Sequence, residues 1–407
     1  MEDEALFRNY HRVTIPQYLE LLQKVGPAIQ KLSVTREAIS SGLRLSLTLR
    51  YLCDGSSMAT MSYEYRISRS SVSRAFDNTG SQFFNYHGTF STVLLAACDA
   101  DYRFTYVHIG AAGRESDSGI FQQCEFGQQI LNGMLPLPPP LLLRSAPGVE
   151  KRLPAVFVGD AAFPLLTNLM RPYGGVNLSP EQKIFNYRLS RARRIIENTF
   201  GIMAARFQIF RGTIQCCLQT LDRIVMCCVV LHNWLRTQDI LNEDGHGHYA
   251  TPDFVDGEDR NGIMVPGQWR NEVGAAGMRG LQIGAVRNAT DQAKEVRSAF
   301  TYHFLKGGSI PFQWYKLPEF QRDYYMQRRG AGEGVGELSS PQEELQAEDG
   351  LDTFIDVPQL GPGLALSANK FSMWLFLYHL RIDLRPSPLS IAAAQRKPLM
   401  ELHGQLQ

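Results

Sequence analysis

The strongest constraint on the fold is a pair of apolar runs separated by a short polar segment. Residues 89–97 and 104–109 are rich in β-branched, aromatic and aliphatic side chains, and Asp99-Ala-Asp101 lies between them. This pattern predicts an antiparallel hairpin that enters a sheet. Because helical patterns flank the hairpin along the chain, we expect a mixed α/β fold.

Size and composition exclude several classes of protein. The chain has 407 residues, of which 44% are hydrophobic and 20% charged, so it is not a wholly disordered, collagenous or small disulfide-stapled protein. Its 41 basic and 40 acidic side chains give a net charge of +1. Any attraction for nucleic acid must therefore come from local clusters of charge.

Cysteine usage and hydropathy indicate the cellular compartment. The seven cysteines lack C-x-x-C spacing and follow an acidic start, Met-Glu-Asp-Glu, that does not suit a signal peptide. We therefore expect a reducing intracellular compartment. The longest strongly apolar run near the C-terminus, residues 373–378, is far shorter than the roughly 18 to 20 residues that cross a bilayer. No membrane partner is expected.

The N-terminal part, residues 1–76, is predicted to be helical. Apolar side chains recur at helical spacing over residues 18–29, and residues 43–52 favour a second helix, although their alternation also suits a strand. Residues 57–76 then show the order helix, short turn, helix, which is typical of a helix-turn-helix.

The second helix of this pattern, residues 69–76, suits contacts with DNA. Ser68 can cap it, and Arg69 and Arg74 with the neighbouring serines would offer guanidinium and hydroxyl groups to phosphates and base edges. An ordinary helical hairpin with a solvated polar face explains the pattern equally well. The sequence leaves both interpretations open.

Downstream of the predicted β-hairpin the pattern alternates between irregular and regular segments. Residues 132–154 are rich in Pro and Leu and are expected to form an irregular insertion, whereas residues 155–158 are expected to form a short buried strand. A long helical region is predicted over residues 180–236, with breaks near Gly201 and Gly212.

The C-terminal part becomes polar and rich in glycine. An amphipathic helix is predicted around residues 289–305. Residues 330–350 carry acidic side chains and no basic ones, which is typical of a flexible linker. The last fifty residues or so show no interpretable pattern.

Three carboxylates are candidates for binding a metal ion. Asp160 follows the predicted strand, Glu197 lies within the long helical region, and Asp99 lies in the hairpin turn. Mg²⁺ prefers oxygen ligands, and two such ions about 3.5 to 4 Å apart support nuclease or strand-transfer chemistry. Simpler interpretations remain, because Asp160 can cap a turn and Glu197 can pair with Arg193 or Arg194.

A basic cluster surrounds Glu197. Residues 187–211 contain six arginines and Glu197 as the single acid, which gives this segment a charge of +5. Arg188, Arg191 and Arg194 recur every three residues along one side of the predicted helix. Such a row of arginines suits a track for phosphates.

Adjacent cysteines and a histidine offer a weaker metal site. Cys216-Cys217, Cys227-Cys228 and His232 contain zinc-type ligands, but neighbouring cysteines are poorly spaced for tetrahedral coordination. Cys217 and Cys228 also fall on an apolar helical stripe. Buried thiols that pack as small apolar side chains are the better interpretation.

A series of motifs carries a resemblance to one family. They are Phe83-Phe-Asn-Tyr86, Gly88-Thr-Phe-Ser91, Cys98-Asp-Ala100, Tyr102-Arg-Phe104, Ser116-Asp-Ser118 with Phe121, Val158-Gly-Asp-Ala-Ala-Phe-Pro164, Leu169-Met-Arg-Pro-Tyr173, Phe185-Asn-Tyr-Arg-Leu-Ser-Arg-Ala-Arg193, Glu197-Asn-Thr-Phe-Gly201 and Val230-Leu-His-Asn233. Together they resemble the DDE transposases of the PIF/Harbinger type and the Harbinger transposase-derived nucleases. The resemblance covers residues 5–76 and 81–316.

The resemblance implies an RNase H-like catalytic core with a mixed five-stranded sheet, preceded by an all-helical, helix-turn-helix-like region. It also implies cleavage and joining of DNA with Mg²⁺ or Mn²⁺. Asp160 matches the family's second catalytic Asp, and Glu197 matches its catalytic Glu. The first catalytic Asp of the family stands on the first core strand, upstream of the Phe-Asn-Tyr motif. That strand is missing here, because residues 77–83 connect Phe76 directly to the motif.

Asp99 is a weaker candidate for the missing ligand, because it matches a turn between the second and third strands of the family. We therefore expect a nuclear, DNA-associated protein that binds double-stranded DNA through its arginines and is catalytically impaired. The cytoplasm is a second expected location, and a Myb-like DNA-binding protein is the partner that the family implies. The alternatives are a non-catalytic DNA-binding or scaffold protein, and a defective gene model or splice form without a stable fold.

Four parts are expected along the chain. They are a helical region with the helix-turn-helix-like segment at 1–76, a DDE transposase-type nuclease domain at 81–236, a helical C-terminal extension at 237–316, and a linker with a disordered tail at 317–407.

Overall fold

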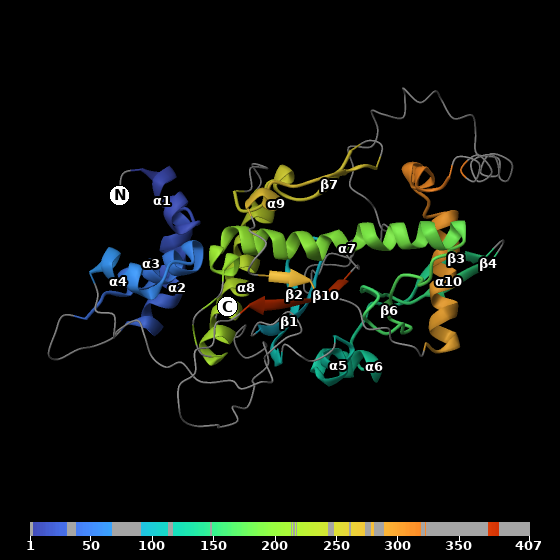
Figure 1. Ribbon diagram of the computed structural model, residues 1–407, viewed down its shortest axis with the longest axis horizontal. Coiled ribbons are helices and arrows are strands. Elements are labelled where there is room, and N and C mark those ends of the chain that lie inside the picture. Colours follow the sequence, from blue (N-terminus) through green and yellow to red (C-terminus); the bar gives the residue numbers. More distant parts are fainter. Residues whose placement is uncertain are drawn as a thin grey trace.

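A computed structural model shows helices packed on both sides of one central sheet (Figure 1). The residues that the structure describes are 3–30, 38–66, 91–112, 117–146, 149–212, 214, 216, 218–242, 248–259, 262–272, 278–280, 289–318, 322 and 373–381.

Four helices form the N-terminal part: α1 (Glu4–His11), α2 (Ile15–Ile29), α3 (Ser41–Asp54) and α4 (Met58–Tyr65). Capping side chains explain where they begin. Thr14 and Gln17 form a capping box on α2, while Ser40 and Ser57 accept hydrogen bonds from the first turns of α3 and α4. These helices agree with the helical N-terminal region predicted from the sequence.

Helix α3 resolves the ambiguous segment at residues 43–52, which is helical as predicted. Leu45, Leu49 and Leu52 recur every three or four residues and are buried in the main core. The second half of the predicted helix-turn-helix, with Arg69 and Arg74, lies outside the described residues. The helix-turn-helix therefore stays a prediction.

The predicted β-hairpin is confirmed. Strands β1 (Ser91–Cys98) and β2 (Phe104–Ala112) pair antiparallel, and Asp99 and Arg103 close the turn between them with a backbone hydrogen bond of 2.9 Å. Residues 93–98 of β1 are completely buried. Leu94 packs in one hydrophobic cluster and Leu95 in another, so β1 has a core on each face.

The central sheet joins segments from distant parts of the chain. Its strand path is β2-β1-β10-β5-β6, with β5 (Phe157–Val158), β6 (Leu169–Met170) and β10 (Met373–Arg381), and β9 (Met278–Gly280) also pairs with β10. Strand β5 confirms the strand predicted at residues 155–158. The central strand β10 corrects the expectation of a tail without structure for residues 373–381, whereas the domain limits stay predictions.

Two layers of helices cover the sheet. On one side lie α7 (Pro180–Arg206) and α8 (Leu218–Leu241), whose apolar side chains join those of α3 in the larger cluster. On the other side lie α5 (Asp117–Gln123) and α6 (Glu125–Leu131) with the smaller cluster (Figure 1). Coverage on both faces explains why β1 is apolar at consecutive positions and does not alternate.

The Pro- and Leu-rich segment contains a second hairpin, which the sequence interpretation missed. Strands β3 (Leu141–Ala146) and β4 (Val149–Leu153) pair antiparallel and contact α10 (Asp291–Leu305). The prolines of this segment precede β3, lie between its two strands or follow β4, at positions that do not interrupt pairing. Helix α10 itself confirms the amphipathic helix predicted around residues 289–305.

The expected helix break near Gly201 is wrong, because α7 continues through it to Arg206. A Cβ atom at Gly201 would lie 2.3 Å from the ring of Trp269. Gly201 therefore allows Trp269 to approach the helix and does not end it. The second expected break, near Gly212, is confirmed by the gap between α7 and α8, which contains the short helix η3 (Gln208–Arg211).

The segment after α8 contains only short elements before α10. Besides β9, the described ones are η4 (Pro252–Phe254), β7 (Gly257–Glu258), β8 (Met264–Val265) and α9 (Trp269–Glu272), and η5 (Pro311–Lys316) follows α10. Among the residues that the structure describes, no helix has the length and apolar character needed to cross a membrane.

We expect Gly201→Ala to destabilise the protein by about 1 to 3 kcal/mol, because the added methyl group overlaps the Trp269 ring. Helix propensity alone would favour Ala over Gly by about 1 kcal/mol, so the sign of the effect identifies the contact. Thermal and urea unfolding measure it. The control is Gly212→Ala, where an added methyl group meets nothing within 4 Å. Equal stability of wild type and Gly201→Ala would contradict this contact.

Candidate active site

Asp160 lies directly beyond strand β5. The Gly159 N–H still donates to the Met170 carbonyl at 2.9 Å, and the chain then turns, with the Phe163 N–H donating to the Asp160 carbonyl at 3.4 Å. The Asp160 carboxylate accepts a hydrogen bond from the Ala162 N–H at 2.9 Å. This turn fixes the carboxylate at the carboxyl end of a parallel strand, where open α/β sheets place ligand-binding groups.

Glu197 projects from α7, which packs on β5. Helix α7 begins at a capping box, and its buried side chains Ile196 and Phe200 hold this part of the helix against the core. Arg193 lies one turn earlier, and its Nη2 atom is 3.5 Å from Oε1 of Glu197. The ion pair considered for Glu197 from the sequence is therefore confirmed for Arg193.

One guanidinium acts on both carboxylates. Burial raises the pKa of Asp160, whereas the Ala162 N–H and the charge of Arg193 oppose that rise. Burial also raises the pKa of Glu197, and Arg193 is again the leading charge that opposes it, followed by Arg270. The charge of Arg193 thus acts on both Asp160 and Glu197, and its close contact is with Glu197.

Asp99 is engaged in the β1–β2 turn. Its Oδ1 atom accepts the backbone N–H groups of Asp101 and Arg103, and its Oδ2 atom accepts Nε of Arg103, each at 2.9 Å. Within the described ranges, no three His, Cys, Asp or Glu side chains form a group that could hold a metal ion. Asp99 is therefore not brought to Asp160 and Glu197 as a third ligand. Two carboxylates suit one hard divalent cation that keeps water ligands.

The three arginines predicted as a phosphate track are engaged inside the protein. Arg188 is 7% exposed, and its guanidinium lies over the Phe304 ring. Nε of Arg191 is 2.6 Å from Oε2 of Glu258, and Arg194 pairs with the other oxygen of the same carboxylate. Their spacing along α7 was predicted correctly, but the partners that cover them come from distant segments.

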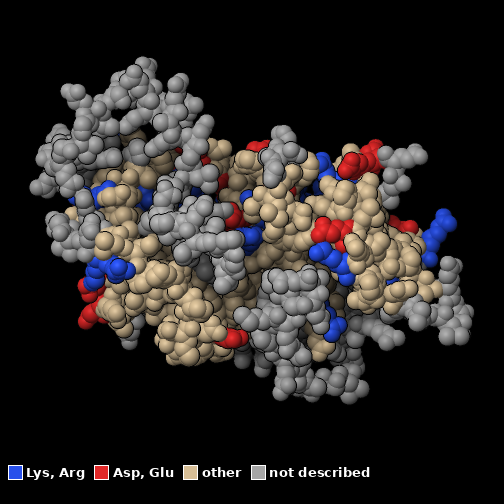
Figure 2. Space-filling model, turned by 180° about the vertical axis from the view of Figure 1, so that it is seen from behind, with Lys and Arg blue, Asp and Glu red and all other residues tan. Residues whose placement is uncertain are grey.

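Figure 2 shows one face of the molecule, on which the described basic side chains appear in small groups, several of them beside acidic ones. A continuous basic surface is not visible on this face. The role of Arg188, Arg191 and Arg194 in binding DNA stays a prediction, as does that of Arg69 and Arg74.

A loop is tied to α7 next to Glu197. Asn198 exchanges two hydrogen bonds with the backbone of Asp256, at 3.2 and 3.0 Å. The Asp256 carboxylate is fully buried and accepts Nε of Arg270 at 2.7 Å. The sequence analysis missed this arrangement, because Asn198 and Asp256 are 58 residues apart. In the sequence, the one local indication of this arrangement was the amide side chain of Asn198, directly beside Glu197.

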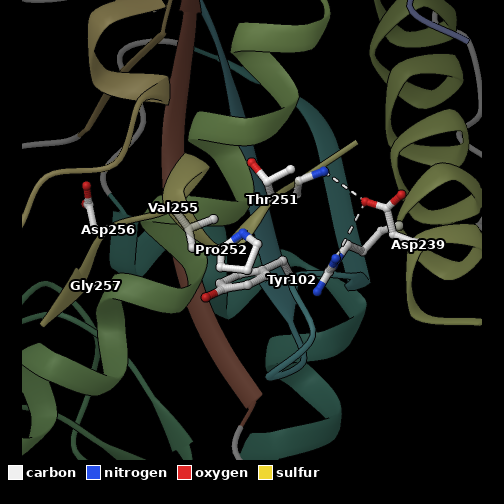
Figure 3. A pocket seen from close by; sticks show the side chains of 9 residues that line it. Tyr102, Asp239, Thr251, Pro252, Val255, Asp256 and Gly257 are labelled. Atoms are coloured by element: carbon white, nitrogen blue, oxygen red, sulfur yellow. Dashed lines mark hydrogen bonds and ion pairs between the residues drawn. The ribbon is translucent and has the colours of Figure 1, made fainter. Parts of the chain in front are cut away.

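A pocket of about 380 Å³ lies beside this loop (Figure 3). Tyr102, Asp239 and Asp256 contribute to its lining. The dashed lines at Asp239 mark its hydrogen bond from the Ala250 N–H and its ion pair with Arg236. Both acids of the pocket are thus paired within the protein, and the pocket contains neither Asp160 nor Glu197.

Comparison with known proteins bears directly on these two carboxylates. Residues 62–233 match the family of DDE superfamily endonucleases, and this segment contains both Asp160 and Glu197. The resemblance predicted from the sequence is confirmed.

A relative agrees with this result. The chain is 32% identical over 151 residues to "Protein ALP1-like" from Arabidopsis thaliana, which covers 35% of this chain and 35% of that protein. The chain therefore matches about a third of the length of this relative. No solved structure matches the chain.

The segment that matches the DDE superfamily endonucleases ends at His232 and Asn233, which bind the β1–β2 hairpin. Nδ1 of His232 is 2.8 Å from the Tyr249 hydroxyl and Nε2 is 2.6 Å from the Tyr102 carbonyl. Asn233 exchanges two hydrogen bonds of 2.8 Å with the backbone of Phe104. These residues hold α8 against the hairpin. The described cysteines are unbridged, most of them buried, and form no metal-ligand group with His232, which agrees with buried thiols.

Burial lowers the pKa of His232 to about 4. The unfolded chain therefore binds a proton more readily than the folded chain, and the stabilisation is present above pH 6.5 and lost as the pH falls from 6.5 to 4. We expect this residue to contribute a loss of up to about 3 kcal/mol over that range. Chemical unfolding at several pH values, for wild type and His232→Asn, measures the difference. Parallel pH profiles for the two proteins would contradict it.

Proposed function

We propose that this protein is a DNA-associated relative of the DDE nucleases that binds one divalent cation and is impaired in catalysis. The observation that carries the proposal is the position of Asp160 directly beyond β5 and of Glu197 on α7, which packs on β5, while no three metal-binding side chains gather in the described part of the chain. Mg²⁺ or Mn²⁺ suits such oxygen donors. When bound, the ion would polarise a phosphate oxygen and lower the pKa of a water molecule.

The central sheet supports an RNase H-like core. Strands β1 and β2 are antiparallel, whereas β10, β5 and β6 run parallel, and together they form a mixed five-stranded path. This is the arrangement that the family resemblance implies. The described neighbour of β5 on its inner edge is β10, and residues 373–381 contain neither Asp nor Glu.

The composition of β10 supports the impairment. Two-metal cleavage needs a ligand shared between the ions, and a carboxylate on a strand beside Asp160 would be suitably placed for that role. No three metal-binding side chains gather among the described residues, and the positive charge of Arg193 acts on both Asp160 and Glu197. These two residues can hold and orient one ion, but they provide no bridge to a second.

We expect the full chain to bind Mg²⁺ or Mn²⁺ weakly at one site, and Asp160→Asn or Glu197→Gln to lower that affinity roughly tenfold or more, which is about 1.4 kcal/mol. Nicking of supercoiled plasmid should stay at background. Calorimetric titration and a plasmid assay measure these quantities, with Glu295→Gln as an exposed control of equal charge change. Rapid nicking that Glu197→Gln abolishes would contradict the impairment, and ion binding unaffected by both variants would contradict the site.

Double-stranded DNA is the proposed partner, in the nucleus and with the cytoplasm as a second location. A Myb-like DNA-binding protein is a further proposed partner, taken from the family resemblance. A non-catalytic DNA-binding or scaffold protein is the alternative function, and the missing third carboxylate in the described ranges favours it. The two functions predict the same DNA binding. They differ in the role of Asp160 and Glu197, which hold a divalent cation only in the first.

Glu258 is expected to limit DNA binding, because it neutralises Arg191 and Arg194 on α7. Glu258→Gln should raise the affinity for duplex DNA several-fold at low salt and steepen its salt dependence by roughly two phosphate contacts. Fluorescence anisotropy over a range of salt concentrations measures both. Glu295→Gln is the matched control, since it removes one exposed carboxylate elsewhere. Unchanged affinity of Glu258→Gln for duplex DNA would show that Arg191 and Arg194 are not part of the DNA-binding surface.

A further inference from the structure

Strand β10 is hydrogen-bonded along both edges to segments that are far away in the sequence. On one edge it pairs antiparallel with β1 over eight positions, from Trp374 opposite Cys98 to Arg381 opposite Ser91. On the other edge it pairs parallel with β5 at residues 373–374 and antiparallel with β9 at residues 378–380. Among the described strands, β10 alone joins β1 to β5.

The slot that β10 fills belongs to the most deeply buried part of the sheet. Residues 93–98 of β1 are completely buried with β10 in place. The sequence of β10, Met-Trp-Leu-Phe-Leu-Tyr-His-Leu-Arg, is dominated by aromatic and branched aliphatic residues that favour strands. Helix α7 also contacts β10, so the strand is covered by a helix as well as paired at its edges.

A long polar connection leads to this strand. The last described side chain that packs in a core before β10 is Leu317, in a cluster with Ile184 and Trp314. Residues 318–372 then separate the two, and their composition is rich in Gly, Glu and Gln. The contacts described for β10 are its pairing along both edges and its packing against α7.

We propose that the slot between β1 and β5 is a binding site for one extended apolar strand, and that the chain's own residues 373–381 occupy it as a detachable strand. The interaction is the addition of a strand to open sheet edges, in which main-chain hydrogen bonds supply affinity. Here the strand adds to two edges at once, because β1 and β5 flank it. This inference does not rest on any nuclease activity.

The proposal also connects the tail to the carboxylates. Strand β10 lies beside β5, which leads to Asp160, and it contacts α7, which carries Glu197. Docking of the tail therefore holds the two elements of the candidate site in one sheet and helix unit.

The first test uses the full chain with a protease cleavage site inserted between Gln346 and Ala347. After cleavage, the tail should co-elute with the body on gel filtration, and a fluorescent peptide of residues 370–384 should exchange into the body and saturate at one equivalent. The same peptide with Leu377→Pro should bind at least roughly tenfold more weakly, because proline removes a ladder donor in the middle of the strand. A tail that separates at once, together with no saturable peptide binding, would overturn the proposal.

The second test needs no cleavage. Leu377→Pro in the full chain should lower the melting temperature by several degrees, whereas Gln346→Pro in the connection should leave it unchanged. Equal melting temperatures for the two variants would overturn the proposal. Light scattering shows which chain supplies the strand. A monomer with a docked tail supports occupation of the slot by the chain's own strand. A dimer that dissociates on Leu377→Pro would assign the slot to a second copy and overturn occupation by the same chain.

Discussion

The burial of strand β1 is the constraint on which the rest of the structure depends. Residues 93–98 are completely excluded from solvent, with one hydrophobic cluster on each face of the strand. Backbone N–H and C=O groups at such positions cannot turn to water, so each edge of β1 needs a neighbouring strand. Strand β2 provides the neighbour on one edge by a local hairpin, and β10 provides the other from the far end of the chain. The stability of the core therefore depends on β10, which lies far from β1 in the sequence.

The elements that the sequence predicted well are those fixed by local chemistry. The β1–β2 hairpin follows from two apolar runs and a turn, and α3 and α10 follow from helical spacing and capping side chains. Strand β10 was missed because its composition permits a strand, but no neighbouring segment of the sequence indicates which strands pair with it. The break expected at Gly201 failed for a related reason, since the glycine accommodates Trp269 from another segment. In both of these misses, a distant contact decided the outcome.

The same difference between local chemistry and distant contacts applies to the candidate site. Asp160 and Glu197 could be found because a strand end and a helical motif carry them, and because the family resemblance covers both. Residues 187–211 carry a surplus of positive charge in the sequence, but part of this charge is neutralised in the folded protein. Glu258, 64 residues after Arg194, returns to α7 and neutralises part of it. Only the tertiary structure could show that a row of arginines had acidic partners.

Arg193 gives the site a property that the carboxylates alone would lack. Burial raises the cost of ionising both Asp160 and Glu197, and the charge of Asp256 adds to that cost at Glu197, so some positive charge must offset it. A divalent cation does so only while bound, whereas a guanidinium on the same helix does so permanently. An ion that bound Glu197 would have to compete with Arg193 for the same carboxylate. The charge of these two acids is thus offset without a bound ion, and the core around Ile196 and Phe200 stays packed without one.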